Sequence, residues 1–227
     1  MGRQLAAKSL PVLELAPPKM DATENIRWIE AAETPWGVPV LDVRAVTQNM
    51  ISTSADPQCA ANAISFDRDD GSAFAADEPA SPRLIGALMR FRVNAPLADG
   101  ALFRPREMEH KWAIFHRQQR ILFVRSWTRR LHAIAELTPC EGGVEITRIR
   151  GVFTDPEESP LFTTMAMDFI LRSHALGMVY PAPLPEGLEE TPLEAAMWCF
   201  KMFGNLALCA THEIIPLNLP ERPLEVL

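Results

Sequence analysis

The chain has 227 residues, of which 48% are hydrophobic and 22% are charged, and its formal net charge is −7. These values are close to those of ordinary globular domains, so they exclude collagen-like, coiled-coil and wholly disordered chains. The length predicts one main domain with a substantial core, and the acidic total argues against a general nucleic-acid-binding protein.

The cysteines and the hydropathy pattern indicate a cytoplasmic protein. The four cysteines are sparse and none forms a C-x-x-C pair, so we expect free thiols in a reducing compartment. No run approaches the roughly 18 apolar residues that a membrane helix needs. Residues 1–16 do not resemble a secretory signal peptide, because Glu14 interrupts their short apolar stretch. An organelle transit peptide stays open as an alternative.

Three regions are expected along the chain. Residues 1–20 are proline-rich and predict an extended arm, residues 21–215 a single α+β domain, and residues 216–227 an extended tail. Asp21 and Glu24 have the spacing of a capping box, which predicts a short helix carrying Trp28.

The next segments predict short strands and a hairpin. Residues 38–46 are rich in β-formers and predict a half-buried strand. Asp70-Gly71 lies between two short apolar runs, 61–66 and 72–75, which is typical of a β-hairpin. An EF-hand loop from Asp67 to Glu78 is excluded, because its glycine stands at the fifth position and the turn needs it at the sixth. Residues 83–93 predict a helix that passes into a strand.

The clearest pattern runs from Lys111 to Phe153. Alternating apolar residues and short turns predict an antiparallel meander of three or four strands. Ser159-Pro160 and Thr191-Pro192 then predict the starts of two apolar helices, the first ending near Gly177. Strands followed by helices, without strict alternation, predict an α+β fold in which the antiparallel meander packs against the C-terminal helices.

The meander carries the candidate binding site. Between Arg104 and His132 the chain has eight Arg or Lys residues and two glutamates, whereas the part from Glu186 onward is acidic. Arginine beside tryptophan and histidine can stack on a planar group and hold an anion. The candidate ligand-binding residues are Arg125, Trp127, Trp112, His116 and Arg117. Arg125 stacked on Trp127 and paired with Glu109 or Glu136 is the purely structural alternative.

The segments KWAIF, from Lys111, and FVRSWT, from Phe123, resemble a hairpin found in uncharacterised bacterial proteins. The resemblance covers about 25 residues, the size of one hairpin. It implies a bacterial protein and brings no activity to Arg125, Ser126 or Trp127.

Catalytic and metal sites have weaker signals. The chain has no G-x-S-x-G, Walker A or G-x-G-x-x-G motif. The histidines of the meander are candidates for acid–base chemistry, and with Cys140 they are the best candidates for zinc, although their spacing matches no known metal motif. They are His110, His116 and His132. Cys199, Cys209 and His212 are a weaker set, and we expect no metal and no cofactor.

Two functions therefore remain in view. The first is a non-enzymatic binding or interaction protein, of bacterial immunity or regulatory type, whose basic aromatic hairpin takes a small anionic ligand or an acidic protein partner. The alternative is an enzyme acting on a nucleotide or phosphoester, with a meander histidine as acid or base and Arg125 as the anion clamp. An enzyme needs histidine and arginine to converge in one concave pocket.

Overall fold

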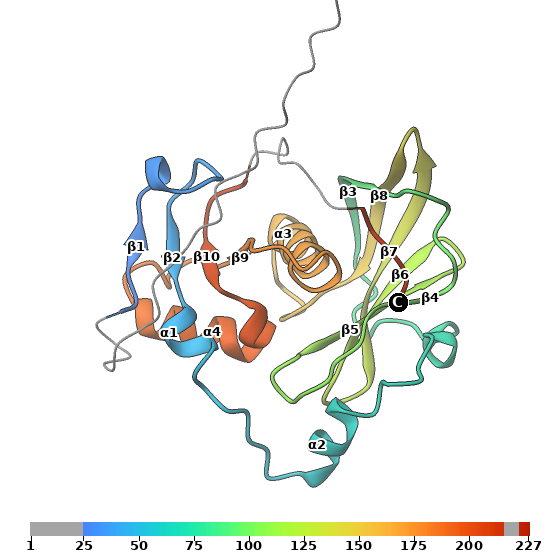
Figure 1. Ribbon diagram of the computed structural model, residues 1–227, viewed down its shortest axis with the longest axis horizontal. Coiled ribbons are helices and arrows are strands. Elements are labelled where there is room, and N and C mark those ends of the chain that lie inside the picture. The colour runs from blue at the N-terminus through green and yellow to red at the C-terminus, as the bar shows by residue number, and fades with distance from the viewer. Residues whose placement is uncertain (1–24, 216–222) are drawn as a thin grey trace, which may run out of the picture.

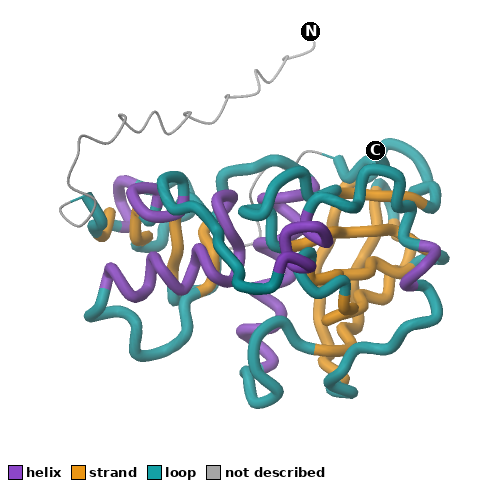
Figure 2. The backbone as a smooth tube through the Cα atoms, turned by 90° about the horizontal axis from the view of Figure 1, so that it is seen from below, coloured by secondary structure: helices purple, strands orange, loops and turns teal. Residues whose placement is uncertain are grey.

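The computed structural model describes residues 25–215 and 223–227. Two β-sheets lie on either side of a central helix, α3 (Pro160–Ile170), as Figure 1 shows. The view in Figure 2 shows helices between the two groups of strands. The predicted α+β class is confirmed. The N-terminal arm and the capping box at residues 21–24 lie outside the described residues.

The larger sheet contains the predicted meander. Its strand order is β3-β8-β7-β6-β5-β4, and every neighbouring pair is antiparallel. Strands β5 to β8 follow one another in sequence and in space, so the predicted meander is confirmed. The strands are β3 (Leu84–Arg92), β4 (Gly100–Phe103), β5 (Trp112–Arg117), β6 (Arg120–Arg125), β7 (Arg130–Cys140) and β8 (Gly143–Gly151).

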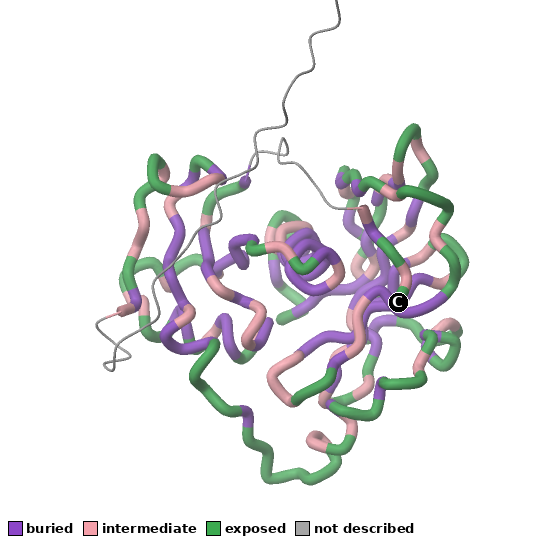
Figure 3. Tube along the Cα trace, viewed as in Figure 1, coloured by how far each residue is buried: buried purple, intermediate pink, exposed green. Residues whose placement is uncertain are grey.

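Strands β5 and β6 are buried on both faces, because each face has its own cover. Trp112 and Phe123 face the main core with α3, whereas Phe115 belongs to a second apolar cluster on the opposite face. Phe66 and Phe74 cover that second face and pack against the Phe115 ring. Figure 3 shows the resulting buried centre of the sheet and of α3.

The predicted hairpin around Asp70-Gly71 is wrong. The segment instead forms helix α2 (Pro57–Ala63), which starts where the Asp56 carboxylate accepts a hydrogen bond from the Gln58 amide, and the 3-10 turn η2 (Ser72–Phe74). The Asp-Gly sequence favours a hairpin turn. In the structure this segment instead buries Phe66 and Phe74 against the large sheet, and their burial determines its conformation.

Three other local expectations also need correction. Residues 84–92 are one strand, in which Ile85 and Phe91 face the core and Leu88 is exposed. The expected strand 38–46 is short, β2 (Val40–Asp42), because the Asp42 carboxylate accepts the Arg44 amide and side chain and the chain turns into α1 (Arg44–Thr47). The segment around Trp28 is strand β1 (Trp28–Ile29) and not a helix, because it pairs with β2.

The smaller sheet has the order β1-β2-β10-β9, and its last pair, β10 (Cys209–Thr211) and β9 (Pro181–Pro183), is parallel. Helix α4 (Pro192–Phe203) packs against α1 beside it, as Figure 1 shows, and the 3-10 turn η4 (Gly204–Leu206) follows it. A short 3-10 turn, η1 (Ala31–Glu33), connects β1 to β2.

Both predicted helix starts are confirmed. Ser159 caps α3 by accepting the Phe162 amide, and α3 continues into a π-helical turn, η3 (Leu171–Ala175). Gly177 follows with φ +59, the left-handed conformation that ends such a segment. Helix α4 begins at Pro192, but the Thr191 side chain accepts no capping hydrogen bond.

Part of the expected C-terminal tail is described. Residues 223–227 have no regular secondary structure, and the amides of Leu224 and Leu227 donate to Arg92 and Ala101. This segment therefore connects the end of β3 with the beginning of β4. None of the helices in the described ranges is long and apolar enough to cross a membrane.

Candidate functional site

Two of the candidate ligand-binding residues, Arg125 and Trp112, lie together at the junction between the large sheet and α4. The two residues are opposite each other on β5 and β6, and the guanidinium lies 4.9 Å from the Trp112 ring centre. Arg125 donates to the carbonyls of Met202 and Lys201, at 2.7 Å each, and Trp112 Nε1 donates to Met202 at 2.9 Å. Carbonyls in the last turn of a helix lack intrahelical partners and attract cations. Arg125 and Trp112 therefore hold the end of α4.

Burial lowers the pKa of Arg125 to about 10, and the guanidinium still carries its charge at neutral pH. Two of its nitrogens are engaged by the protein's own carbonyls. The structural alternative expected from the sequence is wrong in both partners. Arg125 stacks on Trp112 and not on Trp127. It donates to carbonyls of α4 and not to Glu109 or Glu136.

Lys111 occupies the neighbouring position, although the sequence did not single it out. It is 3% exposed, and Nζ donates to Ser52 Oγ at 2.5 Å and to the Met108 carbonyl at 2.8 Å. Nζ also lies 4.3 Å from the ring centre of Trp127, whose Nε1 donates to the same Met108 carbonyl. None of the described carboxylates forms an ion pair with this amine. Burial, together with the charge of Arg125, lowers the pKa of Lys111 to about 8, and Glu109 partly opposes the shift.

Because its pKa is lowered on folding, Lys111 contributes more to the free energy of unfolding as the pH rises from about 8 to 10.5. The unfolded chain binds the lysine proton up to about pH 10.5, whereas the folded chain releases it near pH 8, so raising the pH between these values favours folding.

Taken alone, this effect of Lys111 is a gain of about 2 kcal/mol in the free energy of unfolding between pH 7.5 and 9.5. The buried thiols of Cys199 and Cys209, whose pKa values burial raises, oppose it over the same range. From pH 7.5 to 9.5, the change in the free energy of unfolding measured with urea should therefore be about 2 kcal/mol more positive in the wild type and in the control Lys201→Met than in Lys111→Met. An equal change in the wild type and in Lys111→Met would contradict the assignment.

The three meander histidines have separate partners. His110 accepts the Arg106 amide at Nδ1 and packs edge-on against Phe103, 5.2 Å between ring centres. His132 packs edge-on against Trp112, and burial lowers its pKa to about 4, with Arg125 adding to the shift. Nowhere in residues 25–215 and 223–227 do three or more metal-binding side chains gather in a group that could hold an ion.

His174, which the sequence reasoning missed, is a buried histidine. Its Nδ1 is 2.7 Å from Ser173 Oγ, and its ring packs edge-on against Phe103 and Phe169. Burial, with His110 nearby, lowers the pKa of His174 to about 3. No local motif marks this residue, because its burial comes from the packing of η3 against β4.

Three other arginines of the basic segment contact the loop that carries Phe66 and Phe74, and one of them also contacts Asp99 in the loop before β4. Arg129 forms an ion pair with Asp69 at 2.6 Å, and Arg117 lies 3.4 Å from Asp70 and 3.7 Å from Asp99. Arg120 donates to the carbonyl of Ala75. The loop that carries Phe66 and Phe74 thus supplies much of the negative charge opposite the basic segment.

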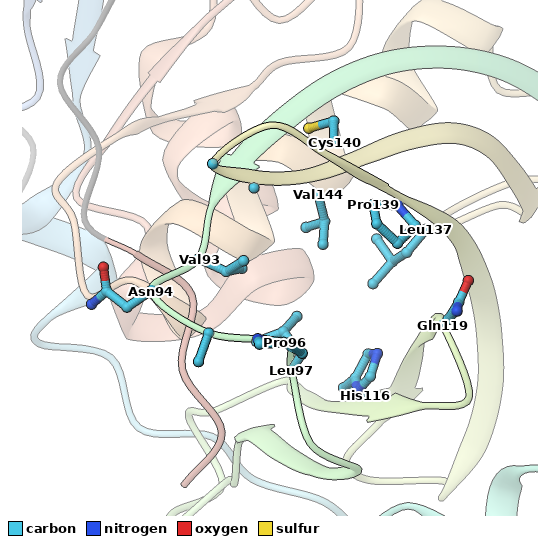
Figure 4. Close-up of a pocket in the computed structure, with 13 residues that line it drawn as sticks. Val93, Asn94, Pro96, Leu97, His116, Gln119, Leu137, Pro139, Cys140 and Val144 are labelled. Atoms are coloured by element: carbon cyan, nitrogen blue, oxygen red, sulfur yellow. The ribbon is translucent and has the colours of Figure 1, made fainter.

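His116 faces a different feature, a cavity of about 410 Å³ at one end of the large sheet. Figure 4 shows it between the loop after β3, the β5–β6 turn and the β7–β8 hairpin. The lining is mainly apolar, and none of the residues described around it is Lys, Arg, Asp or Glu. The lining residues are Val93, Asn94, Ala95, Pro96, Leu97, His116, Gln119, Leu137, Pro139, Cys140, Gly142, Gly143 and Val144.

No family model, curated protein or solved structure matches this chain. The chemistry of the cavity is therefore inferred from its own residues. His116 and Cys140 both line it, but Figure 4 shows them on opposite sides, so they do not form a nucleophile–base pair. Of the predicted ligand-binding and catalytic residues, only His116 is in the cavity lining, together with Cys140, which the sequence offered as a zinc candidate. The cavity is made from three segments distant in sequence, which is why no single motif predicted it.

Proposed function

We propose that this protein is a non-enzymatic binding protein whose ligand is a small, uncharged and mainly apolar molecule. The observation that carries the proposal is the cavity at the end of the large sheet. Its volume of about 410 Å³ is within the range of small-molecule sites, and its walls are apolar with few polar groups. A charged ligand would lose its hydration there without gaining an ion pair.

The expectation of an anionic ligand at Arg125 and Trp127 stays a prediction, with less support. Two guanidinium nitrogens of Arg125 already donate hydrogen bonds to carbonyls of α4, and the Trp127 indole donates to the Met108 carbonyl. The enzyme alternative needs a histidine and a cationic clamp in one pocket, whereas the cavity lining includes His116 without an arginine. These points favour the binding function over the enzyme.

An uncharged naphthalene dye, 6-propionyl-2-dimethylaminonaphthalene, tests the proposal. We expect a blue-shifted emission on binding, because the dye leaves water for an apolar site. Ala95 is exposed and lines the cavity, so Ala95→Trp should weaken binding about tenfold or more by occupying the space. Ala76→Trp, at an exposed loop position outside the lining, is the matched control and should bind like the wild type.

Cys140 gives a second readout at the same cavity. In a Cys59→Ser background the remaining thiols, Cys199 and Cys209, are buried, so Cys140 is the accessible thiol among the described cysteines. Bound dye should slow its reaction with a bulky thiol reagent, and prior labelling should block the dye. Equal binding by both tryptophan variants, with no protection of Cys140, would refute the proposal. Stabilisation by phosphorylated compounds that Arg125→Ala abolishes would favour the alternative.

A further inference from the structure

The orientation of His116 is set by one hydrogen bond. Its Nδ1 lies 2.8 Å from the carbonyl oxygen of Ala98, in the loop between β3 and β4. A carbonyl oxygen can only accept, so Nδ1 carries the proton. In the neutral ring the other nitrogen, Nε2, is then an acceptor with a free lone pair.

No described residue donates a hydrogen bond to Nε2 of His116. His116 is 5% exposed, and its contacts with described residues, to Ala98 and to Asp99 at 3.7 Å, both involve Nδ1. The ring belongs to the cavity wall and faces the cavity in Figure 4. An apolar molecule in the cavity would shield this acceptor from water, so a molecule that brings its own donor is favoured at this point.

The other polar side chains of the lining are placed differently. Asn94 and Gln119 are exposed and lie at the rim. Cys140, on the opposite side, offers only a weakly hydrogen-bonding thiol. The cavity therefore combines apolar walls with one strong acceptor, Nε2 of His116.

We propose that His116 Nε2 anchors the ligand by accepting a hydrogen bond from its single hydroxyl or N–H group. This inference rests on the proposed function and names the ligand class, which is an uncharged apolar alcohol, phenol or N–H compound. The apolar part fills the space between Val93, Leu137 and Val144, and the donor points at His116. Matching compounds that lack the donor bind more weakly.

Two probes that differ in one donor test the anchor. 1-Naphthol has a hydroxyl, and 1-methoxynaphthalene replaces its proton with a methyl group. Their dissociation constants are measured by displacement of the naphthalene dye from the full chain. The preference is the dissociation constant of 1-methoxynaphthalene divided by that of 1-naphthol. This ratio should be about fivefold to tenfold higher for the wild type than for a variant without the acceptor. Comparing the preference between proteins cancels the intrinsic hydrophobicity of each probe.

Two substitutions separate the acceptor from the structural hydrogen bond. The amide nitrogen of His116→Asn can still donate to Ala98, but this variant has no acceptor at the Nε2 position, so it should lose the preference. His116→Gln places an amide near that position, and its oxygen should restore part of the preference. In the wild type, the ¹⁵N shift of His116 Nε2 should change with 1-naphthol and stay constant with 1-methoxynaphthalene. This readout needs no variant to fold.

The outcomes distinguish the two proposals. If both probes bind with an unchanged preference in His116→Asn, and Nε2 does not respond, the anchor is overturned while the binding function stands. If neither the dye nor either probe binds the wild type, the proposed function fails and the anchor with it. Loss of the preference in His116→Asn and its partial return in His116→Gln support the anchor.

Discussion

Gly204→Ala is expected to lower the free energy of unfolding by about 4 kcal/mol. Gly204 ends α4 with φ +77 and ψ −155, a conformation that residues with a side chain rarely adopt. A methyl group there would collide with the Glu109 carbonyl oxygen and approach the Lys111 side chain. The backbone cannot move aside easily, because Arg125 and Trp112 hold the adjacent Met202 carbonyl. Urea unfolding at neutral pH measures the loss.

Gly187→Ala is the matched control. Gly187 also has a positive φ, +88, but an added methyl group would meet nothing within 4 Å. The substitution Gly187→Ala should lower the free energy of unfolding only by the cost of holding alanine at positive φ, about 1–2 kcal/mol. Equal losses for the two variants would show that the contact between the end of α4 and Glu109 is not tightly packed.

The second large effect is expected in acid. The folded protein holds His132 and His174 neutral, with pKa values of about 4 and about 3, whereas an unfolded histidine has a pKa near 6.5. Below pH 6.5 the unfolded chain therefore binds more protons than the folded chain, and stability falls with pH. At pH 5 each histidine should cost about 2 kcal/mol, so the pair removes about 4 kcal/mol relative to pH 7.5. This is a large fraction of the stability of an ordinary domain.

Substitutions assign this pH dependence to the two histidines. His174→Phe should reduce the difference in unfolding free energy between pH 7.5 and pH 5 by about 2 kcal/mol, whatever it does to stability at neutral pH. His132→Phe keeps an aromatic edge for Trp112 and should have a similar effect. Phe169→Leu alters the packing around His174 without removing a titratable group, so it should leave the difference unchanged. An undiminished difference in both histidine variants would mean that other groups carry it.

The end of α4 is held by several residues of the large sheet and of the segment before β5. Arg125, Trp112 and the segment around Lys111 all contact the last turn of α4 or the residues beside it. These contacts connect the large sheet to α4, which packs beside the smaller sheet. The cationic and aromatic residues of the hairpin thus contribute to holding the two parts of the fold together.

Local signals in the sequence were sufficient to predict the central strands of the large sheet and the starts of two helices. Alternation over six or more residues predicted the meander from β5 to β8, and serine or threonine followed by proline predicted where α3 and α4 begin. These signals are local because period-2 burial and the missing amide hydrogen of proline act within a few residues. The α+β class follows from the order of these elements.

The smaller sheet, the conformation around Asp70-Gly71 and the cavity depend on contacts between segments that are distant in the sequence, so local signals could not predict them. The strands of the smaller sheet have two or three residues each, too few for a periodic pattern, and they exist through pairing with one another. The segment around Asp70-Gly71 does not form a hairpin, because the burial of Phe66 and Phe74 against Phe115 outweighs the local preference of Asp-Gly for a hairpin turn. The register of β5 and β6 places Trp112 opposite Arg125, and both residues donate to the end of α4, about 77 residues after Arg125. The cavity likewise needs three segments together, so the role of His116 became visible only in the folded chain.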